Sequence, residues 1–294
     1  MTEHFGEVLT AMVTPFDENL DVDLEQTAKL ATYLVENGSD GLVVLGTTGE
    51  VPVLTEEEKV NILQTVVDEV GDRATIVAGT GSYSTAASIN MTRKAQDIGV
   101  DGIMLVVPYY NKPPQKGLYK HFSMIAAETS LPVMIYNVPG RTSRNIEPDT
   151  VKDLSEIDNI IAIKEASGDV SQFSEITRIT DEDFYVYSGD DNCTMPILSV
   201  GGQGIISVAS HLVGKEIKKM IRAFKKGNVE EAIRLNKKLT PIFSGIFINT
   251  NPIPVKAALN MMGINVGGLR PPLIELGNAD KEQLQKILKD TGVF

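Results

Sequence analysis

Cysteine and histidine are scarce in this chain of 294 residues, and their scarcity excludes several kinds of site. Cys193 is the only cysteine, so neither an intramolecular disulfide nor a thiolate metal cluster can form. His4, His121 and His211 are too scattered in the sequence to indicate a zinc site, and no carboxylate–histidine motif accompanies them. These counts argue against a thiolate or zinc site, and we expect the protein to use no metal and no other cofactor.

Positive charge is also in deficit, with 27 lysines and arginines against 39 acidic residues and a net charge of −12. This balance argues against nucleic acid and anionic membrane surfaces as partners. No apolar run reaches the roughly 18 residues of a membrane helix, and residues 1–6 lack the charged-then-apolar pattern of a signal peptide. We expect a cytoplasmic protein with neither a nucleic-acid nor a membrane partner.

What the sequence does have is a regular alternation of short apolar segments with amphipathic segments of helical period, as far as residue 226. The eight strand candidates are residues 8–13, 41–45, 74–78, 102–107, 132–137, 160–164, 184–188 and 204–208. Eight alternations in about 220 residues are typical of an α/β fold of the (β/α)8 or TIM-barrel type. An open doubly wound sheet is the alternative, although no Gly-x-Gly-x-x-Gly follows the first strand.

The helical segments carry recognisable start signals and apolar faces. Thr55 followed by Glu58 has the form of a capping box. It opens a helix whose predicted buried face contains Val60, Leu63, Val67 and Val70. A second face comprises Val213, Ile217, Met220, Ile221 and Phe224. Beyond residue 226 only helices are predicted, over 229–247, 254–262 and 280–289, so we expect a barrel domain (1–226) and a C-terminal helical appendage (227–294).

Lys164 stands out because it ends the otherwise apolar strand predicted over residues 160–164, within the stretch 159–167. Burying an ammonium without a partner is costly, and the usual response is loss of the proton. Burial can lower a lysine pKa to about 7–8, the range in which the amine attacks carbonyl carbons. The alternative is a lysine that reaches solvent or pairs with Glu165.

Other polar residues follow the predicted strands, at the end of a barrel where active sites are built. Each has an ordinary interpretation. The Gly46–Gly49 turn has hydroxyls that could cap a helix, or backbone amides that could bind an anion. Tyr110 and Tyr136 could be core or interface aromatics. Arg141 could be a surface ion-pair residue or a bidentate clamp for a carboxylate.

Taken together, these residues favour one chemistry. A neutral lysine that forms and releases an imine needs nearby phenol or hydroxyl groups to carry protons. An anionic keto acid needs amides and hydroxyls for its carboxylate. The sequence therefore indicates a Schiff-base lyase or synthase that acts on a small oxo acid.

Four motifs give the sequence a resemblance to a known family. They are Gly46-Thr47-Thr48-Gly49-Glu50, Pro108-Tyr109-Tyr110-Asn111, Tyr136-Asn137-Val138-Pro139-Gly140-Arg141-Thr142 and Ile163-Lys164-Glu165-Ala166. In these motifs, and in register from Thr14 to Pro254, the chain resembles the dihydrodipicolinate synthase family of pyruvate-dependent class I aldolases. Within that superfamily, Gly140-Arg141-Thr142 is the feature that distinguishes this family.

The resemblance implies the condensation of pyruvate with L-aspartate 4-semialdehyde to 4-hydroxy-tetrahydrodipicolinate, on the diaminopimelate route to lysine. It implies that Lys164 forms the imine and that Tyr136 carries protons. Tyr136 would be linked through Thr47 to Tyr110, which in the family comes from a neighbouring subunit, so a homodimer or homotetramer is expected. The residues expected to bind substrate are Thr47 and Thr48 at the pyruvate carboxylate, Arg141 at the carboxylate of the second substrate, and Gly189 and Ile206 in the pyruvate pocket.

One departure from the family concerns regulation. In members that lysine inhibits, the effector is held by small polar residues, histidines and an asparagine. The matching positions here are Val51, Pro52, Glu56, Lys59 and Tyr83, although Tyr109 is kept. A cationic effector would lose hydrogen-bond partners and meet Lys59, so we expect weak or absent feedback inhibition.

Two alternative functions remain open on the same fold. One is the same imine chemistry with another aldehyde, as in N-acetylneuraminate lyase or keto-deoxy sugar acid aldolases. Arg141 argues against it, because an acidic semialdehyde needs that clamp more than a sugar does. The other is a non-catalytic sensor of small acids, which would have no need for both Lys164 and Tyr136.

Overall fold

The computed structural model describes residues 4–293, and its eight strands follow one another in chain order as a closed parallel barrel. They are β1 (Val8–Ala11), β2 (Gly41–Val44), β3 (Thr75–Gly79), β4 (Gly102–Val106), β5 (Val133–Asn137), β6 (Ile160–Glu165), β7 (Tyr185–Ser188) and β8 (Gly204–Ser207). All eight predicted strands are confirmed, and closure rules out the open-sheet alternative. Their near-continuous burial explains why they read as apolar runs, as strands covered on both faces do.

By its internal contacts the chain divides into two compact units. The first comprises residues 75–206 with the start of the chain up to Glu7, and the second comprises residues 8–74 and 207–294. The C-terminal helices therefore belong to the same unit as β1 and β2. The predicted domain boundary at residue 226 is not tested by this grouping and stays a prediction.

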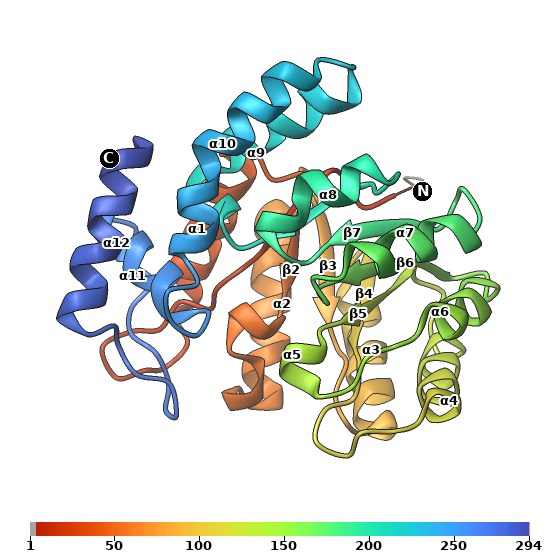
Figure 1. Cartoon of the computed structure of the whole chain (residues 1–294). Coiled ribbons are helices and arrows are strands. Elements are labelled where there is room, and N and C mark those ends of the chain that lie inside the picture. Colours follow the sequence, from red (N-terminus) through yellow and green to blue (C-terminus); the bar gives the residue numbers. More distant parts are fainter. Residues whose placement is uncertain (1–3, 294) are drawn as a thin grey trace. The chain divides into compact units, whose positions relative to one another are not determined.

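The first unit contains β3 to β7, β8 as far as Ile206, and the helices between them (Figure 1). These are α3 (Thr85–Ile98), α4 (Gln115–Ala126), α5 (Pro139–Thr142), α6 (Pro148–Ser155), α7 (Val170–Ile179), the 3-10 turn η3 (Asp191–Cys193) and α8 (Thr194–Ser199). The pairing of β5 with β6 places Tyr136 opposite Lys164, and the pairing of β6 with β7 places Lys164 opposite Tyr187. The strand register thus brings a phenol and an amine together.

The second unit contains β1, β2 and the remaining helices. These are α1 (Leu24–Glu36), the 3-10 turns η1 (Thr47–Gly49) and η2 (Val51–Val53), α2 (Glu56–Val70), α9 (Ser210–Lys225), α10 (Val229–Gly245), α11 (Ile253–Met261) and α12 (Asn278–Thr291). α9 and α10 lie side by side (Figure 1). The three predicted C-terminal helices are confirmed with shifted ends. Within residues 4–293, no helix is both long and apolar enough to cross a membrane.

The capping box at the start of α2 is confirmed in both directions. The Thr55 hydroxyl accepts from the Glu58 amide at 3.2 Å, and Glu58 accepts from the Thr55 amide at 2.7 Å. The predicted buried face of α2 is partly wrong. The buried residues are Ile62, Leu63, Val66 and Val70. Val60 and Val67 are only half-buried, because on a helical wheel they fall beside the arc that the buried four share.

On α9, four of the five residues predicted to be buried are buried, namely Val213, Ile217, Met220 and Ile221. The fifth, Phe224, is half-buried in the last turn of the helix. The helical period alone does not show where along its length a helix stops being covered.

Candidate active site

Lys164 is buried near the end of β6, with only 6% of its surface exposed. Burial lowers the pKa of its amine to about 7. The nearby carboxylate of Asp191 opposes this shift and the guanidinium of Arg141 adds to it. A substantial fraction of the amine is therefore neutral, and nucleophilic, near neutral pH. The alternative in which Lys164 reaches solvent is wrong.

The neighbouring Glu165 is occupied elsewhere. Successive side chains of a strand point to opposite faces, so Glu165 is directed away from Lys164. Its buried carboxylate accepts from Asn137 Nδ2 at 2.9 Å, Gln172 Nε2 at 2.9 Å and the Ser167 amide at 2.7 Å. Burial raises the pKa of Glu165, and these hydrogen bonds oppose the rise. The alternative that pairs Lys164 with Glu165 is therefore wrong too.

Tyr136 lies beside the amine of Lys164. Its ring is buried on β5, and Lys164 Nζ lies 4.2 Å from the ring centroid. A phenol at this position can exchange protons with an amine or with an imine formed on it. The structure thus brings together the two residues that the sequence predicts as nucleophile and proton carrier.

Gly189 follows β7 and lies against the lysine side chain. A Cβ atom at this position would come within 3.0 Å of Lys164 Cε and 2.8 Å of Ala166 Cβ. The absence of a side chain at Gly189 therefore leaves the room that Lys164 occupies. Ile206 is fully buried on β8, the strand that pairs with β7.

Arg141 and Tyr110 are the two predicted site residues of this unit that are exposed to solvent. Arg141 lies on the short helix α5, and its positive charge helps to lower the pKa of Lys164. Tyr110 follows β4, has a left-handed backbone (φ 68°) and leaves 93% of its surface exposed. Its neighbour Tyr109 instead packs edge-on against Tyr83, with ring centroids 5.3 Å apart.

Thr47 and Thr48 lie in the second unit, in the 3-10 turn η1 that follows β2. Thr48 is buried, and its hydroxyl accepts from Asn251 Nδ2 at 2.9 Å. The Thr14 hydroxyl donates to the Gly49 carbonyl at 2.7 Å and fastens the end of the turn. The alternative in which these threonines cap a helix is wrong, since neither η1 nor η2 has a side-chain cap and the N-cap of α2 is Thr55.

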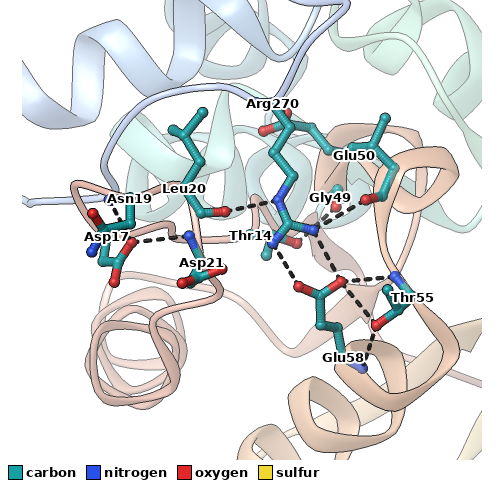
Figure 2. A network of polar contacts seen from close by, with 11 residues as sticks. Thr14, Asp17, Asn19, Leu20, Asp21, Gly49, Glu50, Thr55, Glu58 and Arg270 are labelled. Atoms are coloured by element: carbon teal, nitrogen blue, oxygen red, sulfur yellow. Dashed lines mark hydrogen bonds and ion pairs between the residues drawn. The ribbon is translucent and has the colours of Figure 1, made fainter.

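Sequence reasoning missed the polar contacts that join Glu50 and Glu58 to Arg270 around this turn (Figure 2), and those that join Glu50 to Lys256. Glu50 is part of the recognised motif, but its ion pair with Lys256 joins positions far apart in the chain. A signal was present, because Lys256 is the one charged residue in the apolar stretch from Ile253 to Leu259. The same reasoning that singled out Lys164 applies to it. Among residues 4–293, no three His, Cys, Asp or Glu side chains are grouped so as to hold a metal ion.

A buried lysine of lowered pKa on a strand of a parallel barrel, beside a buried tyrosine, is the arrangement that an imine-forming lyase of the class I aldolase type requires. Comparison with known proteins makes the assignment specific. The model of the dihydrodipicolinate synthetase family matches residues 4–291, and the chain belongs to this family.

Curated relatives of high identity agree with this assignment. The chain is 56% identical to the 4-hydroxy-tetrahydrodipicolinate synthase of Heliobacterium modesticaldum, over 98% of this chain and 96% of that protein. It is 57% identical to the corresponding enzyme of Desulforudis audaxviator, over 99% of both chains. By this close homology the chain has 4-hydroxy-tetrahydrodipicolinate synthase activity, a lyase reaction of lysine and diaminopimelate biosynthesis.

Solved structures share the fold. Dihydrodipicolinate synthase from Bacillus anthracis superposes with a TM-score of 0.95 at 51% identity, covering 97% of this chain and 98% of that one. The enzyme from Cyanidioschyzon merolae, solved with lysine bound, gives 0.97 at 45% identity over 99% of both chains. The enzyme from Acinetobacter baumannii, solved with pyruvate, gives 0.96 at 37% identity, covering 99% of this chain and all (100%) of that one.

Proposed function

We propose that the chain condenses pyruvate with L-aspartate 4-semialdehyde through an imine on Lys164. The observation that carries this proposal is the buried amine of Lys164, with a pKa of about 7, beside the ring of Tyr136. The neutral amine attacks the keto carbon of pyruvate, water leaves, and an imine forms. Loss of a proton from the methyl group then gives an enamine.

The enamine carbon attacks the aldehyde of the second substrate and forms the new carbon–carbon bond. The amino group of that substrate then attacks the imine carbon, which closes the ring and releases Lys164. These steps need protons to be moved to and from oxygen, nitrogen and carbon. We assign this transfer to Tyr136, linked through Thr47 to Tyr110.

The binding roles follow from the shared motifs. Thr47 and Thr48 hold the carboxylate of pyruvate, and Arg141 receives the carboxylate of aspartate semialdehyde. Gly189 and Ile206 line the pyruvate pocket, and the tight fit between Gly189 and Lys164 supports the role of the glycine. The pyruvate bound to the A. baumannii relative supports pyruvate as the first substrate.

The assembly that we propose is a homodimer or a homotetramer. Tyr110 supports it, because a tyrosine with 93% of its surface exposed has its ring available to another subunit. A proton relay through Tyr110 of a neighbouring subunit would make that assembly necessary for turnover. Cytoplasmic localisation stays a prediction.

Borohydride reduction in the presence of pyruvate tests the proposal directly. We expect mass spectrometry to locate the reduced adduct on Lys164 and nowhere else. Lys256 is an internal control, because it is another buried lysine of lowered pKa, yet it is paired with Glu50 and should remain unmodified. Intact turnover with an unmodified Lys164 would refute the mechanism.

Assays with sugar aldehydes in place of aspartate semialdehyde test the alternative substrate class.

We also propose that lysine inhibits this enzyme weakly or not at all. Val51 and Pro52 form η2 and offer no side-chain hydrogen bonds, while Lys59 on α2 adds a positive charge. Burial lowers the pKa of Lys59, and Glu56 and Glu58 counteract the shift. Halving of the initial rate by millimolar lysine would contradict this proposal.

A further inference from the structure

The turn that carries Thr47 and Thr48 ends at a residue in an unusual state. Glu50 has a left-handed backbone (φ 55°), which is uncommon for a residue other than glycine, and only 3% of its surface is exposed. Its carboxylate accepts from Lys256 Nζ at 3.0 Å and from the Arg270 backbone amide at 3.1 Å. Both partners come from the C-terminal part of the chain, so the conformation of the turn depends on residues more than 200 positions away.

Lys256 contacts both this carboxylate and the segment that follows β1, at Thr14. It is 1% exposed, its amine also donates to the Thr14 carbonyl at 2.9 Å, and it lies 4.2 Å from the centroid of the Phe16 ring. Thr14 in turn donates to the Gly49 carbonyl. Lys256 therefore contacts the turn directly through Glu50 and indirectly through Thr14.

Arg270 fixes the other side of Glu50 (Figure 2). Its guanidinium donates to the two carboxylate oxygens of Glu58 at 2.5 and 2.9 Å, and to the carbonyls of Leu20 and Val53 at 2.8 and 3.1 Å. This geometry fixes the position of its backbone, whose amide then reaches Glu50. The guanidinium also lies 4.7 Å from the Phe16 ring centroid, measured to Cζ.

Asn251 acts on Thr48 itself. Its amide nitrogen can only donate, so the Thr48 oxygen is the acceptor of their hydrogen bond. A hydroxyl that accepts at its oxygen remains free to give its own proton to another acceptor. The bond with Asn251 thus leaves Thr48 as a donor, which is the role that a bound carboxylate requires.

We propose that Asn251, Lys256 and Arg270 are positioning residues, which fix the turn at Glu50 and the hydroxyl of Thr48 so that both present donors to the keto-acid carboxylate. This inference rests on the proposed function, in which Thr47 and Thr48 bind that carboxylate. The plainer interpretation is that the charged group stabilises the fold and has no bearing on substrate affinity. The two interpretations differ in their consequences for KM.

The first test replaces Asn251 with aspartate. In N251D the new carboxylate accepts the proton of Thr48 and adds a negative charge beside the carboxylate site. We expect the KM for pyruvate to rise roughly tenfold or more, which corresponds to the loss of one charge-assisted hydrogen bond. The kcat at saturating pyruvate should change by less than about threefold, since Lys164 is untouched.

The matched control is the same change in a Thr48→Val background. The added charge acts in both backgrounds, so a rise in KM in the Thr48→Val background measures that charge alone. If Asn251 acts through the Thr48 hydroxyl, N251D should raise KM further in the wild type than there. An equal rise in both backgrounds, or no rise in the wild type, overturns the inference. Borohydride trapping of the wild type is measured in parallel. Failure to trap pyruvate on Lys164 refutes the proposed function, whereas normal trapping with an unchanged KM in N251D refutes only the positioning role.

The second test separates stability from positioning. Lys256→Met leaves Glu50 buried without its cation and should lower Tm strongly. The double variant Lys256→Met with Glu50→Gln removes both charges and should recover much of that loss. We expect the KM for pyruvate in the double variant to stay at least about fivefold above the wild type, because the ion pair that fixes the turn is gone. Recovery of both Tm and KM would show that the group serves stability alone.

Discussion

Two lysines of this protein are almost completely buried, and their surroundings give them different tasks. Lys256 has a carboxylate at 3.0 Å and a carbonyl at 2.9 Å, and its pKa is lowered only to about 8. Lys164 lies over a tyrosine ring, and its pKa is lowered to about 7. In both cases burial is the main cause of the shift. The direct ion pair to Glu50 keeps Lys256 a structural cation, while Lys164 can act as a nucleophile.

The charges around Lys164 predict opposite shifts of its pH profile. The neutral amine is the reactive form, so the rate of imine formation with pyruvate should rise as pH increases through about 7. Asp191 raises this pKa, so Asp191→Asn should move the rise to lower pH. Arg141 lowers it, so Arg141→Leu should move the rise to higher pH. The measurement is the rate of borohydride-trapped adduct between pH 5.5 and about 9. Shifts in the same direction for both variants would contradict this electrostatic account.

Gly189→Ala tests the packing of the reactive side chain. The added methyl group would lie 3.0 Å from Lys164 Cε and 2.8 Å from Ala166 Cβ, so the lysine must move. We expect kcat/KM to fall at least about 100-fold, because small displacements of reacting groups are costly. Gly277→Ala is the matched control, since a methyl group there meets no atom within 4 Å. Comparable activity of the two variants would rule out the steric role.

At the scale of the element, α2 is fastened at its first turn by a residue with two functions. Glu58 closes the capping box with Thr55 and also accepts from the guanidinium of Arg270. The hydrogen bond to Arg270 is the main reason that the pKa of Glu58 is lowered to about 2. The N-terminal cap of α2 and the ion pair with Arg270 therefore depend on the same carboxylate.

Replacing Glu58 with glutamine should give a pH-dependent loss of stability. A carboxyl whose pKa is lower in the folded state than in the unfolded state stabilises the fold above its ordinary pKa of about 4.5. That stabilisation disappears as pH falls through about 2. The difference between wild type and Glu58→Gln in urea unfolding should thus be largest above pH 5 and shrink steadily on acidification. A difference that is constant from pH 7 to pH 3 would contradict the assignment.

The elements themselves could be predicted well from the sequence, and their long-range contacts could not. The strands were recognisable because burial on both faces leaves an apolar run, and α2 because its cap is local. The hydrogen bond from Asn251 to Thr48 and the ion pair of Lys256 with Glu50 join residues that no local pattern connects. Lys164 was predictable because its motif and its odd surroundings agree. Lys256 had only the apolar surroundings and no recognised motif. Its ion-pair partner, Glu50, could not be named without the fold.

At the scale of the whole molecule, the question is whether one subunit completes the site of another. The test mixes two variants that the proposed mechanism makes inactive, Lys164→Met and Tyr110→Phe, and lets their subunits exchange. If Tyr110 acts across the interface, a mixed dimer contains one site with both an intact Lys164 and an intact Tyr110. Activity should then recover toward a quarter of the wild-type value, on the assumption of random mixing.

The control is the double variant Lys164→Met/Tyr110→Phe mixed with the wild type. In that mixture the mixed dimers gain no complete site, so the activity should only decline with the added double variant. Absence of recovery in the first mixture, with exchange verified by native mass spectrometry, would place Tyr110 in the site of its own subunit.

The contacts of Asn251, Lys256 and Arg270 also bear on how such enzymes can be recombined. A chimaera that joins residues 1–226 of one homologue to residues 227–294 of another would take the anion at position 50 from one parent and the cation at position 256 from the other. Removing residues 227–294 altogether would leave the buried carboxylate of Glu50 without Lys256, its ion-pair partner. Functional exchange of residues 227–294 should therefore require both parents to carry the same five residues at positions 48, 50, 251, 256 and 270.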